Sequence, residues 1–294
     1  MRVKNNIKTM LTFQVTGPTD KGAACMLHNA MYEYANLNAL DFHLGIEKGG
    51  LKSVVDAVKN LGLKGFYLGE PHKTDVIAYL DEVDPISRDL LCVNTVVNQN
   101  GKLYGIGLDG VGMGMAIEHD LASVKGKSVL IIGAGAVGGL IAADLCERGA
   151  KRIHIANRTK EKARNIAVTL QKYYNIPVSF SSLKEVEMYA KDTDLLVQCS
   201  SVGNAAHPEL HFESLDYVDV LPKNCIVADV NYPVTELIER AEKNGLKTIA
   251  GESMMYFQQI EAMKTQFGVN LSDDCIQEGR EAVAIAIALR AFNN

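Results

Sequence analysis

The feature that most constrains the fold is a run of apolar residues that leads directly into closely spaced glycines. Residues 128–132 read SVLII, a composition typical of a strand buried on both faces of a parallel sheet. The sequence GAGAVG follows at residues 133–138, and a helix is predicted over Val137–Arg148, ending at Gly149. A strand, a glycine turn and a helix in this order are typical of a dinucleotide-binding unit.

The glycine turn has the physical properties that a bound pyrophosphate requires. Gly133 makes the turn, Gly135 lets the pyrophosphate approach the backbone, and the helix N-terminus offers N–H groups and a positive dipole. A glycine turn that carries no ligand is the alternative, since such turns are common. The predicted cofactor-binding residues of this turn are Gly133, Gly135, Ala136, Val137 and Gly138.

The residues after the second strand of this unit, which is predicted to end at Ala156, indicate the type of dinucleotide. An acidic residue is usual there because it accepts hydrogen bonds from the adenosine ribose hydroxyls. This chain has Asn157 instead, followed by Arg158, Thr159 and Lys162, which can donate to a 2′-phosphate. The sequence therefore predicts NADP. The alternative is that these cations are only the solvated start of a helix.

Alternating strands and helices along the rest of the chain predict an α/β protein. We expect an N-terminal α/β substrate domain of residues 1–122, rejoined by a helix over residues 272–294, and a C-terminal NADP domain of residues 123–271. The C-terminal domain is predicted to be a Rossmann-type doubly wound parallel sheet. The strands of the N-terminal domain are predicted at residues 12–16, 39–44, 65–68, 91–97 and 102–105, and its helices at 25–34, 51–61 and 74–80. The later strands are predicted to end at Ala156, Gln198, Asp229 and Ala250.

Composition and charge argue against several classes of function. A formal net charge of −5 gives no general attraction to nucleic acid or to anionic membranes. The six cysteines are scattered without a C-x-x-C pair, so we predict no metal site. The N-terminus is too polar for a signal peptide and no apolar run is long enough to span a bilayer. We expect a cytoplasmic enzyme, a monomer or homodimer, that acts on a small molecule.

Seven short motifs occur in an order and spacing that resembles the shikimate dehydrogenases and their quinate-using relatives. The resemblance covers nearly the whole chain. The motifs are PHK at 71–73, VNTV at 93–96, GIGLDG at 105–110, GAGA at 133–136, NRTKEK at 157–162, DVNYPVTEL at 229–237 and GESMMYFQ at 251–258.

The resemblance implies an N-terminal substrate domain, a C-terminal NADP domain, hydride transfer between nicotinamide and a ring alcohol or ketone, and a place in aromatic amino acid biosynthesis. Lys73 and Asp109 are then the catalytic pair, and Asn94 and Gln258 bind substrate. Alcohol oxidation requires such a pair, because a lysine beside an aspartate can stabilise the alkoxide and move the proton. Taken alone, Lys73 is better explained as a helix-start cation and Asp109 as a turn acid, and the resemblance reverses this preference.

The chain departs from the family pattern only in its substrate half. The two serines of the family's Ser-x-Ser-Pro stretch, which hold the substrate carboxylate, correspond to Gly22 and Ala24. A buried carboxylate without donors costs several kcal/mol, on the order of 2–5. We therefore predict that shikimate is a poor substrate and that Lys21 supplies a replacement contact.

A second departure precedes the PHK motif. The family's Asn-Val-Thr-Ile reads Tyr67-Leu68-Gly69-Glu70 here, and the Asn-Thr before the catalytic aspartate reads Gly107-Leu108. Tyr67 is accordingly predicted to contact an altered substrate.

Two other functions are compatible with the same fold. The first is a non-catalytic NADP-binding regulatory protein, and the second is a methylenetetrahydrofolate-type dehydrogenase, which also uses a lysine. Retention of all four residues implied by the resemblance disfavours the regulatory protein, since a sensor needs no proton shuttle. His28 and His72 lie near the motifs but are predicted to be structural.

Overall fold

The computed structural model divides into two compact units, which we describe separately. Unit 1 comprises residues 1–108 and 258–294, and unit 2 comprises residues 109–257. The described residues are 6–18, 23–120, 123–204, 207–232, 234–271, 277–282, 284, 285 and 288. Among them, no helix is both long enough and apolar enough to cross a membrane.

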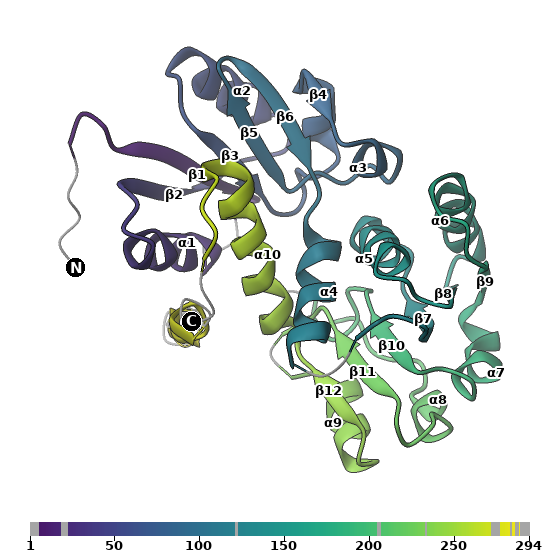
Figure 1. Ribbon diagram of the computed structural model, residues 1–294. Coiled ribbons are helices and arrows are strands. Elements are labelled where there is room, and N and C mark those ends of the chain that lie inside the picture. The colour runs from purple at the N-terminus through teal and green to yellow at the C-terminus, as the bar shows by residue number, and fades with distance from the viewer. Residues whose placement is uncertain are drawn as a thin grey trace. The chain divides into compact units, whose positions relative to one another are not determined.

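Unit 1 is built on a six-stranded mixed sheet with the order β2-β1-β3-β5-β6-β4 (Figure 1). The strands are β1 (Met10–Thr16), β2 (Ala39–Gly45), β3 (Gly65–Leu68), β4 (Glu82–Val83), β5 (Thr95–Gln99) and β6 (Lys102–Ile106). The helices are α1 (Ala23–Tyr34), α2 (Leu51–Asn60), the 3-10 helix η1 (Asp75–Tyr79), α3 (Pro85–Asp89) and α10 (Gly251–Phe267), whose last part belongs to this unit.

Two sequence signals explain most of this sheet. Strand β1 pairs in parallel with β2 and β3, and helices α1 and α2 supply the crossovers that parallel neighbours need. Strands β5 and β6 form a hairpin, since Asn100 and Gly101 adopt the positive φ angles of 55° and 93°. The apolar face of α2 packs on one side of the sheet in a single core cluster.

Unit 2 is a six-stranded sheet in which every pairing is parallel, in the order β12-β11-β10-β7-β8-β9. The strands are β7 (Ser128–Ile132), β8 (Arg152–Asn157), β9 (Val178–Ser182), β10 (Leu195–Gln198), β11 (Ile226–Asp229) and β12 (Lys247–Ile249). The helices are α4 (Asp109–Asp120), α5 (Ala136–Glu147), α6 (Lys160–Tyr173), η2 (Leu183–Glu185), α7 (Val186–Ala190), α8 (Asp216–Asp219), α9 (Glu236–Lys243) and the first part of α10.

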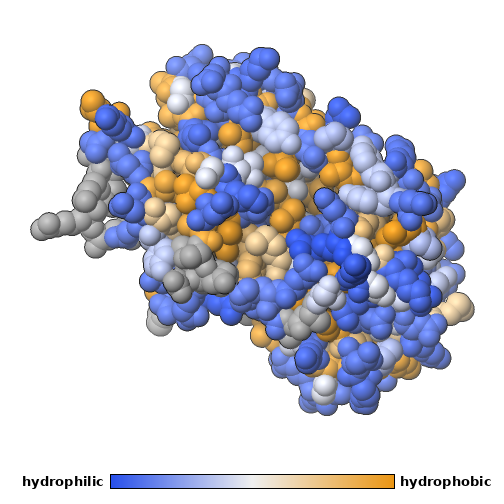
Figure 2. Space-filling model, in the orientation of Figure 1, coloured by the Kyte–Doolittle hydropathy of each residue, from blue (hydrophilic) through white to orange (hydrophobic). Residues whose placement is uncertain are grey.

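This strand order is that of the predicted doubly wound fold. The chain leaves β7 toward β8 and β9 on one side and later returns to place β10 on the other. The ends of β7 and β10 therefore form the crevice where such folds bind nucleotides. Helix α9 shows the expected amphipathic pattern, because Leu237, Ile238 and Ala241 are buried while the surface at the lower edge of Figure 2 is mostly hydrophilic.

The compact units divide the chain at other points than the expected residues 122 and 271. Helix α4 groups with unit 2 because it lies against α5 so closely that a β-carbon on Gly110 would be 2.2 Å from the carbonyl oxygen of Leu140. Helix α10 is divided between the units after Phe257. Residues 277–282 are helical, as predicted, but most of the expected segment 272–294 lies outside the described residues.

Local elements follow the predictions with one difference in type. The segment expected as a helix over residues 74–80 is the 3-10 helix η1 rather than an α-helix. It begins just after Pro71, and Thr74 is held by a hydrogen bond from its hydroxyl to the carbonyl oxygen of Leu91, 2.8 Å away. Single turns of 3-10 helix are common in short connecting segments such as this one.

Replacing Gly110 with alanine is expected to destabilise unit 2. The added methyl group must push α4 away from the α5 backbone, and overpacking of this kind costs roughly 1–3 kcal/mol. Calorimetry should show a thermal midpoint lower by roughly 3–10 °C. Gly135→Ala is the matched control, because its β-carbon would meet no atom within 4 Å. An unchanged midpoint for Gly110→Ala would contradict the close approach of the two helices.

Candidate functional site

The glycine turn of unit 2 depends on the absence of side chains at two positions. Gly133 has a φ angle of 106°, and a β-carbon there would lie 2.6 Å from the backbone nitrogen of Ser200. A β-carbon on Gly138 would lie 2.5 Å from the carbonyl oxygen of Gly133. The turn therefore packs directly against the backbone that follows β10, and α5 packs directly on the turn.

Gly135 differs from the other two glycines because nothing in the protein occupies the space beside it. It is the exposed N-cap residue of α5, and an ideal β-carbon there would meet no heavy atom within 4 Å. Ala136 and Val137 form the first turn of that helix, which begins one residue earlier than predicted. The N–H groups at this helix end are thus accessible to an anion such as a pyrophosphate.

Asn157 braces the glycine turn. Its side-chain oxygen accepts a hydrogen bond from the N–H of Ala134 at 3.1 Å, and its amide nitrogen donates to the carbonyl oxygen of Thr159 at 2.9 Å. The sequence predicted that Asn157 would donate to a phosphate, but the structure places both ends of its amide on the backbone. Asn157 therefore contributes by joining the turn to the end of β8.

The cations after β8 are exposed. Arg158 and Lys162 form no ion pair within the described part of the chain, whereas Lys160 lies 3.5 Å from the Glu185 carboxylate. Thr159 is the N-cap residue of α6 and its hydroxyl makes no capping bond. Arg158, Thr159 and Lys162 are thus available to a phosphate at the carboxyl end of β8, next to the glycine turn.

A buried polar cluster holds the segment after β10, and sequence reasoning assigned it no role. Asn231 donates its side-chain N–H groups to the carbonyl oxygens of Ser200 at 2.9 Å and Val202 at 3.0 Å. Asp229 accepts from the backbone N–H of Asn231 at 2.9 Å and from the Thr235 hydroxyl at 2.7 Å. Burial raises the pKa of Asp229 to about 7, although these hydrogen bonds act to lower it. The cluster fixes Ser200 against Gly133.

In unit 1 the candidate residues gather at one edge of the sheet. The carboxyl ends of β1 and β3 lie at this edge together with the start of β5, because β5 runs antiparallel to β3. Asn94, the residue before β5, is 3% exposed. Its side-chain oxygen accepts from the N–H of Leu108 at 3.0 Å and from the Thr95 hydroxyl at 3.1 Å. Its side-chain nitrogen is buried and has no partner in the described structure.

Backbone hydrogen bonds and chain neighbours connect Asn94 with the two candidate catalytic residues. The carbonyl oxygen of Lys73 accepts a hydrogen bond from the N–H of Val93, the residue before Asn94, at 2.9 Å. Leu108, which bonds the Asn94 side chain, directly precedes Asp109 in the chain. Lys73 is half-buried and Asp109 is 2% exposed at the start of α4. Gln258 is half-buried on α10.

Tyr67, which the sequence predicted to contact an altered substrate, is buried in unit 1. It is 2% exposed, and its hydroxyl is 2.9 Å from that of Tyr32. Burial raises the pKa of the Tyr67 phenol well above its usual value of 10. The Tyr32 hydroxyl also lies 3.0 Å from that of Thr12, which donates to Asp41 at 2.6 Å. This placement gives no support to Tyr67 as a substrate ligand, and Lys21 lies outside the described residues.

Both histidines near the motifs make structural hydrogen bonds, as predicted. The Nδ1 of buried His28 donates to Asp41 at 2.8 Å, and its Nε2 lies 2.5 Å from the side-chain oxygen of Gln259 on α10. The Nε2 of His72 lies 3.3 Å and 3.2 Å from the carbonyl oxygens of Thr16 and Ile46. These bonds tie α1, α10 and the segment before Lys73 to the strands beside them.

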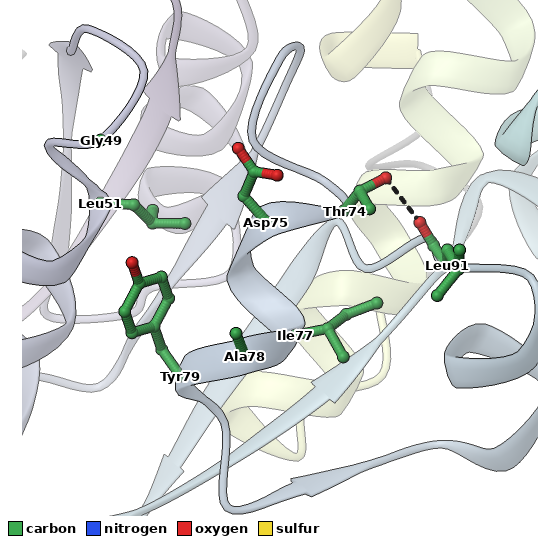
Figure 3. Close-up of a pocket in the computed structure, with 8 residues that line it drawn as sticks. All are labelled: Gly49, Leu51, Thr74, Asp75, Ile77, Ala78, Tyr79 and Leu91. Carbon is green, nitrogen blue, oxygen red and sulfur yellow. Dashed lines mark hydrogen bonds between the residues drawn. The ribbon is translucent and has the colours of Figure 1, made fainter.

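A hollow of about 490 Å³ lies on another part of unit 1 (Figure 3). Its lining contains none of the predicted site residues, and half of the lining residues come from η1. The hydrogen bond from Thr74 to Leu91 crosses one side of it. The lining residues are Gly49, Leu51, Thr74, Asp75, Ile77, Ala78, Tyr79 and Leu91. Across the described ranges, no three His, Cys, Asp or Glu side chains gather in a way that could hold a metal ion.

Comparison with known proteins identifies the family. The family model for Shikimate / quinate 5-dehydrogenase matches residues 116–250, and that for the shikimate dehydrogenase substrate binding domain matches residues 16–96. The NADP(+) shikimate dehydrogenase of Alkaliphilus metalliredigens (strain QYMF) is 34% identical over 267 residues, which are 88% of this chain and 92% of the relative. The chain belongs to the shikimate/quinate dehydrogenase family.

Solved structures confirm the fold of this shikimate dehydrogenase family member. A shikimate dehydrogenase in complex with NADP+ superposes with a TM-score of 0.83 at 28% identity, covering 95% of this chain and 96% of the other. The ligand-free 5-ketofructose reductase of Gluconobacter sp. strain CHM43 also gives a TM-score of 0.83, at 26% identity and with 95% and 99% coverage. The predicted family, the α/β fold and an NADP-dependent dehydrogenase all agree with these relatives.

Gly135→Ala should weaken cofactor binding without weakening the fold. The added methyl group meets no protein atom, but it occupies the space in front of the α5 N-terminus where a pyrophosphate would approach. We expect the dissociation constant for NADPH, measured by fluorescence titration, to rise at least about tenfold, equivalent to about 1.4 kcal/mol. The thermal midpoint should stay within about 1 °C. Unchanged NADPH affinity would show that the space beside Gly135 is not used.

Proposed function

We propose that this chain is an NADP-dependent oxidoreductase that transfers hydride between nicotinamide and a ring alcohol or the corresponding ketone. Family membership and the open α5 N-terminus support the cofactor half of this proposal. The observation that carries the substrate half is Asn94, a buried amide whose nitrogen has no partner in the described structure although its oxygen is fully engaged. A buried donor without a partner is uncommon, and a bound substrate oxygen would satisfy it.

The proposed chemistry uses Lys73, Asp109 and Asn94. Reduction of a ketone places negative charge on the carbonyl oxygen as hydride arrives, and that oxygen then takes up a proton. The Lys73 ammonium stabilises the developing charge and donates the proton, and the Asp109 carboxylate orients the hydroxyl. Asn94 donates to a second oxygen of the substrate and so fixes the ring, while Gln258 supplies a further polar contact from α10. The glycine turn and the cations after β8 would hold the cofactor, which in its reduced form, NADPH, would supply the hydride.

The substrate differs from shikimate in the group that it presents to the start of α1. Ala24, at one of the two serine positions of the family pattern, has no hydroxyl with which to bind a carboxylate, and Gly22 lies outside the described residues. The fold also serves other ketones, since the 5-ketofructose reductase superposes on 95% of this chain. A panel of ring alcohols, hydroxy acids and their ketones, assayed by nicotinamide absorbance, tests this proposal.

Arg158→Ala should weaken NADP binding and leave NAD binding nearly unchanged. Loss of one or two charge-assisted hydrogen bonds, each of about 1.5–3 kcal/mol, should raise the NADP dissociation constant roughly ten- to hundredfold. Titration with both cofactors measures the effect. Arg164→Ala is the control, because Arg164 is an exposed arginine of α6 whose guanidinium already pairs with Glu161 at 2.9 Å. Equal weakening of NADP and NAD by Arg158→Ala would remove this explanation of cofactor choice.

Lys73→Ala and Asp109→Ala should each lower turnover by a factor on the order of 10² to 10⁴, the usual contribution of a positioned acid-base group. Cofactor affinity should survive in both, and the double variant should lose little more than the worse single one. Steady-state kinetics on the best substrate of the panel provide the measurement. Lys59→Ala, which removes an ion pair with Asp81 at 2.9 Å in unit 1, is the control. Turnover near the unmodified rate in either variant would exclude that residue from the chemistry.

A further inference from the structure

Strand β1 carries a nearly buried glutamine whose amide makes no hydrogen bond within the described structure. Gln14 is 7% exposed, and its side-chain oxygen is buried without a partner. Its neighbours on the same face of the strand are satisfied: Thr12 bonds Asp41 at 2.6 Å, and the Thr16 hydroxyl lies 2.8 Å from the His43 Nε2. The lack of a partner is therefore specific to Gln14 on this face.

An unpartnered amide in the interior of a protein is costly. The group loses its bonds to water on folding and gains none in return, and an apolar side chain of the same length would avoid that loss. Stability alone would therefore favour leucine or methionine at position 14. An amide here is explained if a ligand completes its hydrogen bonds.

The position of Gln14 points to the substrate edge of unit 1. The next residue, Val15, pairs with Leu68, whose N–H donates to the carbonyl oxygen of Asn94 at 2.8 Å. The Gln14 side chain extends toward Gly69, because a β-carbon built on Gly69 would lie 3.9 Å from its amide nitrogen. Gly69 is partly exposed and stands four residues before Lys73. Gln14, Asn94 and the PHK segment thus share one edge of one sheet.

Gly69 has no side chain, whereas threonine stands at this position in the family pattern. A side chain cannot simply be added back, since a β-carbon on Gly69 would lie 2.8 Å from the Cγ2 of Thr16. The Gln14 amide nitrogen lies beside Gly69, where no side chain covers it.

We propose that Gln14 is a specificity-determining residue whose side-chain oxygen accepts a hydrogen bond from a substrate hydroxyl. This inference rests on the proposed function. A hydroxyl can donate to the Gln14 oxygen, and another oxygen of the same substrate can accept from the Asn94 nitrogen. A carboxylate has no proton to donate to the Gln14 oxygen. The buried acceptor therefore favours a neutral polyhydroxy ketone or alcohol as the substrate class.

Four ketones test the substrate class with NADPH as reductant. The neutral ones are 5-ketofructose and 2-keto-myo-inositol, and those with a carboxylate are 3-dehydroshikimate and 3-dehydroquinate. We expect kcat/KM for at least one neutral ketone to exceed that for both acids by at least about tenfold. Gln14→Leu should lower that kcat/KM by a factor of about ten to a hundred, the effect of one or two lost hydrogen bonds. Gln14→Glu, which keeps an acceptor oxygen, should retain more activity on the neutral ketone than Gln14→Leu.

Thermal stability separates a ligand contact from a structural role. Gln14→Leu should leave the thermal midpoint unchanged or raise it, because it removes an unsatisfied buried amide. Gln266→Leu is the matched control. Gln266 is buried in unit 1 with an equally unpartnered oxygen, but its amide nitrogen donates to the carbonyl oxygen of Val96 at 3.1 Å. Its loss should lower the midpoint and leave kcat/KM unaltered.

Three results would overturn the inference. The first is a preference for either acid over both neutral ketones, with kcat/KM near roughly 10⁵ M⁻¹s⁻¹, the ordinary range for an enzyme on its own substrate. The second is a Gln14→Leu variant with unchanged kcat/KM, or with a lower midpoint as its only effect. The third is tight NADPH binding with reduction of none of the four ketones. A chain that does not bind NADPH at all would instead contradict the proposed function.

Discussion

The approach of two backbone segments at Gly133 determines the geometry of the cofactor half. Because Gly133 has no β-carbon, the backbone after β10 lies close to the turn after β7. Helix α5 begins directly after this turn. Two side-chain amides secure the arrangement from opposite sides. Asn157 ties the turn to β8, and Asn231 ties the segment after β10 to Asp229. Together, Gly133, Asn157 and Asn231 position the N-terminus of α5 so that it is open.

The substrate unit is organised in a different way, by a polar layer inside the protein. Thr12, Asp41, His28, Tyr32 and Tyr67 link β1, β2, β3 and α1 through buried hydrogen bonds, and Gln259 connects α10 to them. Nearly every group in this layer has a partner within the protein. Among the described residues, the Gln14 side-chain oxygen, the Asn94 side-chain nitrogen and the Nδ1 of His72 are buried without a partner near the edge where β1 and β3 end. A rigid, satisfied layer thus supports a small number of groups that remain open to a ligand.

Sequence reasoning succeeded where a property is local. The glycine turn, strand Ser128–Ile132 and the hairpin at Asn100 and Gly101 each follow from a few adjacent residues, and the structure reproduces them. It did not identify the partners that side chains find in other elements. The Tyr67 hydroxyl lies beside that of Tyr32, 35 residues away, and Asn157 accepts from the N–H of Ala134, 23 residues away. Gln14 drew no attention because an isolated glutamine in an apolar strand has no distinctive spacing, and only its missing partner distinguishes it.

The contact between Gly69 and Thr16 constrains how this binding edge could change during evolution. A threonine at position 69 needs the space that the Thr16 methyl group fills, and the Thr16 hydroxyl is held by His43, so the methyl cannot turn away without breaking that bond. Neither substitution is useful alone. A threonine at position 69 creates a clash with Thr16, and a smaller residue at position 16 leaves a void beside Gly69. A descendant of this chain can therefore acquire the family's threonine only by changing both positions, and the order of mutations begins with loss of the Thr16 side chain.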